Sequence, residues 1–140
     1  MAQERTFAII KPDAVKAGRA GEILDAILKS GLVVRGMRLA RLTPAVCQGF
    51  YHEHVGKGFY PELEAFMSEG PVVVLCLEGE GAILRWRELM GATDPAKAAE
   101  GTLRKRFGSS IGRNATHGSD SPVSAAFEVG YFFSQGFDLV

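Results

Sequence analysis

The sequence predicts a single domain of mixed α and β structure. The chain has 140 residues, which is the size of one domain, and such a domain buries roughly two thirds of the surface that its unfolded chain exposes. Residues 72–77 are apolar at every position, as in a strand covered on both faces. Residues 21–30 instead place their apolar side chains at helical spacing. Because both kinds of segment alternate along residues 1–140, we expect one mixed domain. The pattern does not distinguish parallel from antiparallel pairing of its strands.

Turn and cap residues divide the first half of the chain. Pro12 stops the first strand because it cannot donate a hydrogen bond to a neighbouring strand. Gly31 ends the first helix in the left-handed conformation. Thr43 and Pro44 are suited to the N-cap and first position of a helix. The elements predicted here are a strand at 6–10, a helix at 21–30, a strand at 33–42, a helix from 43 toward 54 and a helix at 61–68.

The second half of the chain contains the clearest strand. Gly70 and Pro71 break the preceding helix, and the apolar run that follows is predicted to lie in the middle of the sheet. Thr102 is predicted to cap a short helix, and Ser121 with Pro122 to begin the last one. The predicted elements are a strand at 72–77, a turn at 79–81, a helix at 82–90, a loop with one helical turn at 91–99, a helix at 102–107, an irregular segment at 108–121 and a helix at 122–133.

Composition excludes several functional classes. Lys plus Arg and Asp plus Glu each number 16, so the formal net charge is 0, which argues against a generally basic nucleic-acid or membrane-surface protein but allows a local basic pocket. No apolar run approaches the ~20 residues that span a bilayer, and the N-terminus does not resemble a secretion signal, so we expect a cytoplasmic protein. Cys47 and Cys76 are the two cysteines, without a CxxC pair, so no disulfide framework or zinc site is predicted, and Cys76 is expected to be a buried small apolar residue.

Histidine is the first candidate for chemistry. His117 lies among small polar residues in a stretch without apolar periodicity, and loops of this kind often carry functional groups. The alternative is a surface histidine in a turn-rich loop. His52 and His54 are two positions apart, so on a helix they diverge and do not chelate one metal ion. Both then belong to a partly exposed helix end.

Cationic side chains are the second candidate. Residues 104–106 are all cationic, and Arg87 borders an apolar helix stripe, so together they can form an anion pocket; the alternative is a solvated surface. Lys11 follows a strand directly, where α/β sheets often bind ligands. No GxxxxGK[ST] phosphate loop exists. A bound nucleotide would therefore need side-chain cations for its phosphates, of which Arg87 and Arg104 are available.

Five motifs occur together in order and with regular spacing. They are Glu-Arg-Thr at 4–6, Ile-Lys-Pro-Asp at 10–13, Gly-Pro-Val-Val at 70–73, Met-Gly-Ala-Thr-Asp-Pro at 90–95, and Asn-Ala-Thr-His-Gly-Ser-Asp-Ser at 114–121. The chain resembles the nucleoside diphosphate kinase family on these motifs, from about residue 4 to residue 133. The last motif is the most specific of them.

The resemblance implies an α+β fold, namely a ferredoxin-like four-stranded antiparallel sheet covered by helices. It also implies an enzyme that moves the γ-phosphoryl group of ATP or another nucleoside triphosphate to a nucleoside diphosphate. The reaction is ping-pong through a phosphorylated histidine, whose matching position is His117. Further implications are a homo-oligomer, either tetramer or hexamer, with nucleotides as ligands and no requirement for nucleic acid. Mg²⁺ is expected to arrive on the nucleotide, without a dedicated carboxylate cage.

Glu128 is the position at which the two lines of reasoning disagree. The resemblance implies that Glu128 accepts a hydrogen bond from the histidine ring, with Ser119 nearby. Helical periodicity instead takes Val123, Ala126, Phe127 and Gly130 as the buried stripe, so Glu128 lies roughly 150° away and faces solvent.

Further site residues follow from the resemblance alone. Lys11 and Asn114 match residues that hold the ribose 3′-hydroxyl region, with Lys11 also near the transferred phosphoryl group. Phe59 matches an aromatic residue that stacks on the base, with Ile111 on the other face of the base. The remaining matches are Tyr51 beside the histidine, and Arg87, Thr93, Arg104 and, in some members, His54 at the phosphates.

The sequence departs from the family pattern at three places. Lys57 and Gly58 stand where Arg-Pro is usual, and Gly58 is expected to loosen the loop that presents Phe59. Arg106 stands where an acidic residue is common, and the C-terminal segment is short.

Two other functional hypotheses compete with the kinase. The first is a sheet that binds nucleotides or single-stranded nucleic acid without catalysis, suggested by Phe59 and residues 104–106. The second is a catalytically silent structural subunit.

Overall fold

The computed structural model describes residues 3–134 and 136–140. Its elements are β1 (Gln3–Ile10), α1 (Pro12–Lys16), α2 (Ala20–Lys29), β2 (Val33–Arg41), α3 (Pro44–Phe50), α4 (Tyr60–Met67), β3 (Pro71–Glu80), α5 (Ala82–Met90), a 3-10 turn η1 (Pro95–Lys97), α6 (Leu103–Phe107), β4 (Thr116–Gly118) and α7 (Pro122–Phe132). The sheet has the order β2-β3-β1-β4, and every pair is antiparallel. This arrangement confirms the ferredoxin-like fold and the central position of the 72–77 segment.

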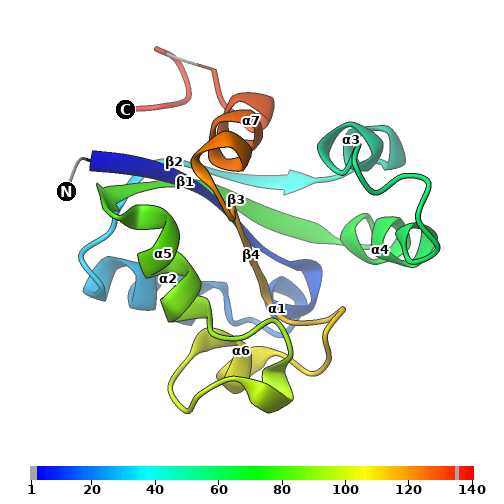
Figure 1. Ribbon diagram of the computed structural model, residues 1–140, viewed down its shortest axis with the longest axis horizontal. Helices are drawn as coiled ribbons and strands as arrows, with labels where there is room; N and C mark the ends of the chain where they lie inside the picture. The colour runs from blue at the N-terminus through cyan, green and yellow to red at the C-terminus, as the bar shows by residue number, and fades with distance from the viewer. Residues whose placement is uncertain (1–2, 135) are drawn as a thin grey trace.

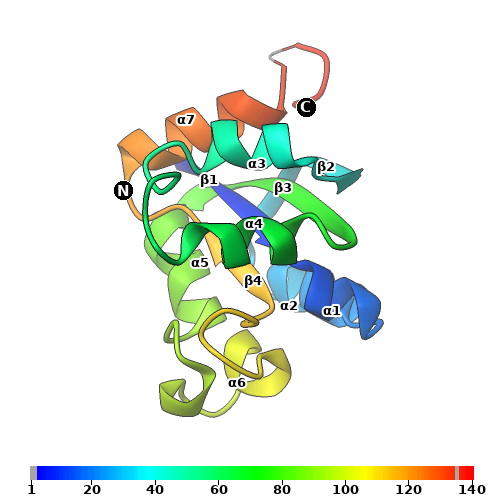
Figure 2. The same ribbon diagram turned by 90° about the vertical axis from the view of Figure 1, so that its right-hand side faces the viewer.

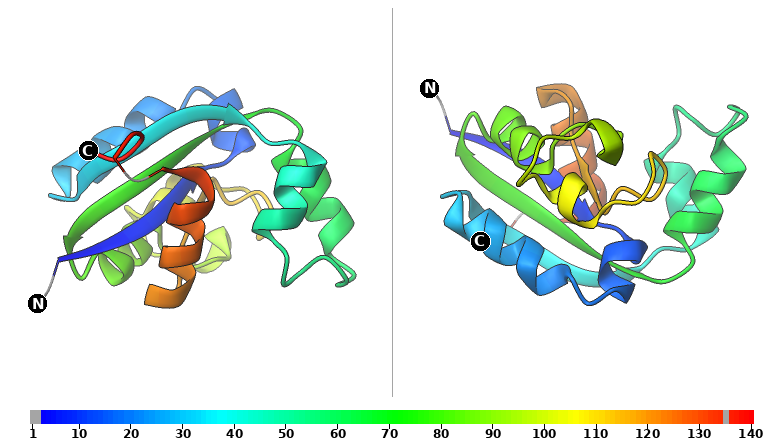
Figure 3. Two further views of the ribbon diagram at one scale, coloured as in Figure 1. Left: turned by 90° about the horizontal axis from the view of Figure 1, so that it is seen from above. Right: turned by 90° about the horizontal axis from the view of Figure 1, so that it is seen from below.

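Helices cover both faces of the sheet (Figures 1 and 2). Alternate residues of β1 point to opposite faces. Phe7 and Ile9 belong to a core that contains residues of α3, α4 and α7. Ala8 and Ile10 belong to a second core that contains residues of α1, α2, α5 and α6. Figure 3 shows α7 crossing one face of the sheet and α2 with α5 on the other. The sheet is therefore buried on both sides, which explains the unbroken apolar run in β3.

Most predicted elements are confirmed, with shifted ends. The predicted turn at 79–81 is wrong, because β3 continues to Glu80 and the chain turns at Gly81, whose φ is 59°. The helix predicted from 43 toward 54 ends at Phe50. Thr102 stands at the N-cap of α6, but its hydroxyl donates to the carbonyl of Ala99 and makes no cap hydrogen bond.

Two elements have no counterpart in the prediction. The helix α1 has five residues, which is too short for an apolar period to be visible. The strand β4 has three residues within the segment predicted as irregular. Its pairing with β1 joins Ile9 to His117 and Ile10 to Thr116. The missed strand therefore carries the principal candidate residue.

The other structural expectations can be compared directly. Cys47 and Cys76 are both buried and reduced. None of the helices in the described part of the chain is long and apolar enough to cross a membrane. A capping box starts α7, since Ser121 Oγ accepts from Ser124 N at 3.1 Å and Ser124 Oγ accepts from Ser121 N at 3.0 Å. This cap fixes the helix directly after β4.

Candidate active site

His117 is held on the sheet face that α3 and α7 cover. It pairs with Ile9, and paired residues of adjacent strands point to the same face. Its ring lies 5.6 Å from the ring of Phe50 and 6.2 Å from that of Phe7, centroid to centroid, both edge-on. The indole nitrogen of Trp86 donates to the His117 carbonyl at 3.1 Å. Backbone and ring are thus both fixed, while 21% of the side chain stays exposed.

A carboxylate holds one nitrogen of this ring. His117 Nε2 and Glu128 Oε1 are 2.9 Å apart, and Ser119 Oγ donates to the same carboxylate oxygen at 2.8 Å. Ser119 is fully buried, and its hydroxyl accepts from the amide of Phe7 at 3.2 Å. Because a carboxylate only accepts hydrogen bonds, Nε2 carries the proton in the neutral ring. The lone pair is then on Nδ1, the nitrogen that can act as a nucleophile.

The periodicity prediction for α7 is wrong. Val123 is 81% exposed and Phe127 41% exposed, whereas the buried positions are Ala125 and Val129. Glu128 is next to that buried face, and only 14% of its side chain is exposed. The helix is apolar on most of its surface, so its sequence has no single hydrophobic stripe from which the buried face could be read. The contact implied by the resemblance is present.

A cavity of about 550 Å³ opens beside the ring. Its walls include His117, Glu128, Tyr51, His54 and Arg87. Arg87 is exposed, and it makes no ion pair with a described residue. Burial, with smaller contributions from Cys47 and Glu128, raises the pKa of Tyr51, so its hydroxyl stays protonated at neutral pH. The cavity therefore offers a nucleophile, a hydroxyl donor and a guanidinium.

A buried polar chain connects three other predicted residues. Lys11 Nζ donates to Asn114 Oδ1 at 2.8 Å, and Asn114 Nδ2 donates to the carbonyl of Thr93 at 3.0 Å. Lys11 is only 8% exposed. Burial, reinforced by the nearby Arg104 and opposed by Asp13, lowers the Lys11 pKa from 10.5 to about 8. The surrounding protein compensates this ammonium poorly, and an anion beside it would favour its charged form.

Arg104 is the second buried cation. It is 8% exposed and donates to two carbonyls, those of Gly91 at 3.1 Å and Thr116 at 2.9 Å, while its Nε has no partner among the described residues. Burial, with the charge of Arg87, lowers its pKa to about 10. None of the described carboxylates pairs with it. A guanidinium that is held by carbonyls alone keeps its full positive charge available to an anion.

A tight turn through Ala115 connects Asn114 with His117. Ala115 has φ 73°, in the left-handed region that disfavours alanine. Its amide donates to Asp13 Oδ2 at 3.1 Å, and the amide of Thr116 donates to the carbonyl of Asn114 at 2.9 Å. Sequence reasoning did not assign a role to Asp13, although the residue lies in one of the recognised motifs. Its carboxylate supports the strained residue between Asn114 and His117.

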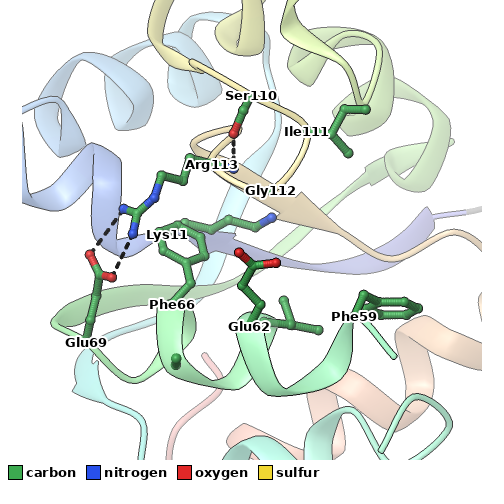
Figure 4. Close-up of a pocket in the computed structure, with 11 residues that line it drawn as sticks. Lys11, Phe59, Glu62, Phe66, Glu69, Ser110, Ile111, Gly112 and Arg113 are labelled. Carbon is green, nitrogen blue, oxygen red and sulfur yellow. Dashed lines mark hydrogen bonds and ion pairs between the residues drawn. The ribbon is translucent and has the colours of Figure 1, made fainter. Parts of the chain in front are cut away.

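A second cavity, of about 620 Å³, lies between α4 and residues 110–113. In Figure 4, Phe59 and Ile111 lie on opposite sides of the space, and the side chain of Lys11 points between them. Phe59 is 53% and Ile111 61% exposed, so two apolar side chains are left uncovered at the same opening. Two such walls can hold a flat ring by stacking and apolar contact.

In the loop before Phe59, Lys57 and Gly58 replace the usual Arg-Pro, and Lys57 contacts His54. Lys57 Nζ is 3.1 Å from His54 Nδ1 and lies 5.9 Å from the centroid of the Phe59 ring. The rings of His54 and Phe59 are 5.4 Å apart. His54, which lines the first cavity, therefore contacts Phe59, which lines the second. Glu62, Glu69 and Arg113 also line the second cavity, and sequence reasoning missed all three.

This combination of parts defines a class of protein. A ferredoxin-like sheet that carries a carboxylate-bound histidine, three cations and an apolar slot has what a nucleotide-dependent phosphotransferase requires. A sequence model described as nucleoside diphosphate kinase matches residues 4–136. The chain belongs to the nucleoside diphosphate kinase family, whose enzymes move a phosphoryl group between nucleotides through a phosphohistidine.

Relatives and solved structures agree over nearly the full chain. The nucleoside diphosphate kinase of Syntrophotalea carbinolica is 60% identical, covering 98% of this chain and 99% of the relative. That of Geotalea uraniireducens is 58% identical, covering 94% and 96%. The Aquifex aeolicus enzyme structure aligns with TM-score 0.96 at 44% identity, covering 99% of this chain and 100% of the other. The Halobacterium salinarum enzyme in complex with CDP aligns with TM-score 0.94 at 37% identity, covering 99% and 92%.

Proposed function

We propose that His117 is the residue that carries the phosphoryl group in this enzyme, and that its Nδ1 is the attacking atom. The observation that carries this proposal is the 2.9 Å contact of Nε2 with Glu128, which leaves Nδ1 as the nitrogen with the lone pair. Arg87 lines the same cavity. A nucleophile whose tautomer is fixed by a carboxylate follows the same logic as a catalytic triad.

The reaction has two half-steps. In the first, Nδ1 attacks the γ-phosphorus of a nucleoside triphosphate, a P–N bond forms, and the P–O bond to the β-phosphate breaks with departure of the diphosphate. The ring becomes cationic, and Glu128 stabilises that charge through the Nε2 proton. In the second, a terminal oxygen of another nucleoside diphosphate attacks the same phosphorus, the P–N bond breaks, and the ring returns to its neutral form.

Cationic side chains neutralise the phosphate oxygens in this proposal. Arg87, Arg104 and Lys11 supply the positive charge, and the low exposure of Arg104 and Lys11 strengthens it. Thr93, Tyr51 and His54 contribute polar contacts around the phosphates and the histidine. Catalysis then consists mainly of positioning and charge neutralisation, as phosphoryl transfer requires.

The nucleoside half of the substrate is proposed to enter the second cavity. Phe59 stacks on one face of the base and Ile111 lies on the other, while Lys11 and Asn114 hold the ribose 3′-hydroxyl. Support comes from the solved halophilic relative, whose structure is a complex with CDP. Stacking needs only the π-face that every base has, so broad base tolerance is expected.

Mg²⁺ is proposed to enter with the nucleotide as part of the substrate. Within residues 3–134 and 136–140, no group of three or more His, Cys, Asp or Glu side chains could hold a metal ion. We expect this ion to be bound mostly by phosphate oxygens and water. The charge that it supplies adds to that of Arg87, Arg104 and Lys11.

The assembly and setting of the enzyme are also proposals. We propose one domain over residues 1–140 that forms a homo-oligomer, tetramer or hexamer, in the cytoplasm. The outer strand β2 supports assembly, because Val33, Met37 and Leu39 expose 44%, 52% and 72% of their surface. An edge strand with exposed apolar side chains is a surface on which another chain can pair or pack.

Mixing the enzyme with ATP and Mg²⁺ in the absence of an acceptor tests the proposed function. We expect a burst of about one ADP per chain and one phosphate that is stable to alkali but labile to acid, located on His117 by mass spectrometry. The absence of a burst, or an adduct on serine, contradicts the proposal.

Glu128 provides a narrower test of the proposed mechanism. Glu128→Gln keeps an oxygen that can accept from Nε2 and Ser119 Oγ but removes the negative charge that stabilises the cationic ring. We expect a roughly 10- to 100-fold slower burst in rapid-quench experiments, with nucleotide affinity little changed. Ser119→Ala is the matched control and should slow the burst less, because the carboxylate stays. A burst of normal rate in Glu128→Gln would show that the charge is irrelevant.

A further inference from the structure

An ion pair closes one end of the second cavity. Arg113 Nη1 donates to Glu69 Oε2 at 3.2 Å, and Arg113 Nη2 donates to Glu69 Oε1 at 3.0 Å. The same guanidinium lies 4.6 Å from the ring centroid of Phe66. All three side chains line the cavity, and Figure 4 shows the pair at the end away from Phe59. The pair therefore joins the end of α4 to the opposite wall of the cavity.

Arg113 also organises the turn that carries Ile111. Its carbonyl accepts from the amides of Ser109 at 2.8 Å and Ser110 at 3.3 Å. Its amide donates to Ser110 Oγ at 3.1 Å. These bonds close a five-residue turn with Ile111 and Gly112 at its tip, which is exposed. Because the glycine gives this tip little stiffness, the position of Ile111 depends on where Arg113 is held.

The wall of the second cavity opposite Ile111 is formed by α4 and the residues at its two ends. Phe59 is the N-cap residue of α4, Phe66 lies in its last turn, and Glu69 follows its end. Lys57 and Gly58 leave the segment before Phe59 exposed, so the helix itself is the firm support of that ring. The ion pair thus connects the helix that carries Phe59 with the turn that carries Ile111.

We propose that Arg113 and Glu69 are positioning residues that set the separation of Phe59 and Ile111, and thereby the affinity for the nucleoside part of the substrate. The inference rests on the proposed function, which places the base between those two side chains. Exposed ion pairs often contribute little to stability. This one is two-pronged and stacked on an aromatic ring, which gives it a defined geometry. Its effect is expected on nucleotide binding and not on chemistry.

A direct role of Arg113 at the phosphates makes the opposite prediction for Glu69. If the guanidinium bound the nucleotide itself, removing the carboxylate would free its charge and lower KM. If the Arg113–Glu69 ion pair instead acts as a brace, that is, if it only holds the 109–113 turn against α4, removing either partner loosens that turn and raises KM. The sign of the effect at Glu69 therefore separates the two roles.

The test compares Glu69→Ala, Arg113→Ala and the double variant in steady-state assays with ATP and several nucleoside diphosphates. We expect KM to rise roughly 3- to 10-fold in each single variant, with kcat within about twofold of the unchanged enzyme. The double variant should resemble the single ones, because both lose the same brace. Asp25→Ala is the control, since it breaks a comparable 2.9 Å ion pair with Lys29 on α2, away from both cavities.

The outcomes that overturn the inference are distinct. A lower or unchanged KM in Glu69→Ala rejects it, as do fold-changes that multiply in the double variant. Glu69→Gln, which keeps the side-chain volume, gives the same decision should Glu69→Ala unfold, and thermal unfolding of each variant identifies that case. The ATP burst separates this inference from the proposed function: a normal burst with unchanged KM rejects the brace alone, whereas a missing burst in the unchanged enzyme rejects the proposed function.

Discussion

Replacing His117 with alanine is expected to eliminate the phosphoenzyme and to lower kcat/KM by roughly 10⁴-fold or more, since loss of a covalent nucleophile has effects of this size. No described histidine can substitute for it. His52 and His54 line the same cavity, but neither contacts Glu128. Without the ring, the cations still bind the nucleotide but have no acceptor to orient it toward. Nucleotide affinity should therefore change far less than turnover.

The control for this variant is His52→Ala. The side chain of His52 is 55% exposed and packs edge-on against Phe127 at 4.9 Å, so its loss removes an imidazole from the same cavity without touching the proposed chemistry. Rapid-quench measurement of the burst and equilibrium binding of ADP are made on both variants. A burst that survives His117→Ala assigns the phosphoryl group to another residue and ends the proposed mechanism.

The histidine site shows where sequence reasoning reaches its limit. The strands β1, β2 and β3 could be predicted because each contains consecutive apolar or β-branched residues, at 6–10, 33–34 and 72–77. The strand β4 has three residues, Thr116, His117 and Gly118, and becomes a strand only through its pairing with β1. Local pattern has no access to a partner more than a hundred residues away. Local composition made His117 a candidate without deciding between a functional and a surface histidine, and the family resemblance decided between them.

Glu128 and Lys11 show the same limit for side chains. The apolar surface of α7 makes its buried face ambiguous, so the contact of Glu128 with His117 could not be derived from the helix alone. The position of Lys11 at a strand end was visible in the sequence, but its hydrogen bond to Asn114 spans 103 positions. The sheet order brings such groups together. Long-range pairing, and not local propensity, builds this site.

Replacing Lys11 with methionine is expected to lower kcat/KM by roughly 10²- to 10³-fold, because the buried charge proposed to neutralise the phosphates and its hydrogen bond to Asn114 are lost together. Methionine has a similar volume, so the core around position 11 is preserved. Asn114→Asp is a useful companion, since it restores a charge partner for Lys11 but places a negative group near the nucleotide. Steady-state kinetics and binding of ADP measure both.

The pH dependence follows from the lowered Lys11 pKa of about 8. In the free enzyme Lys11 loses its proton as pH rises through 8, so KM for nucleotides should increase above pH 8. The Lys11→Met variant should not show this increase. A bound phosphate favours the charged form, so binding between pH 8 and 10 should take up a proton, measurable as a buffer-dependent heat in calorimetry.

As pH rises above 8, the free energy of unfolding should increase, whereas the affinity for nucleotides should decrease. Because the Lys11 pKa is lower in the folded chain than its ordinary 10.5, the unfolded chain holds more protons between pH 8 and 10.5, and this group's contribution to the free energy of unfolding rises across that window. Below pH 8 the buried ammonium costs on the order of 3 kcal/mol, which Lys11→Met should recover in part. Denaturant unfolding of both proteins at pH 7 and pH 10 measures this. If Lys11→Met is no more stable than the unchanged enzyme at pH 7, and the difference does not shrink by pH 10, Lys11 is not the strained cation that the site requires.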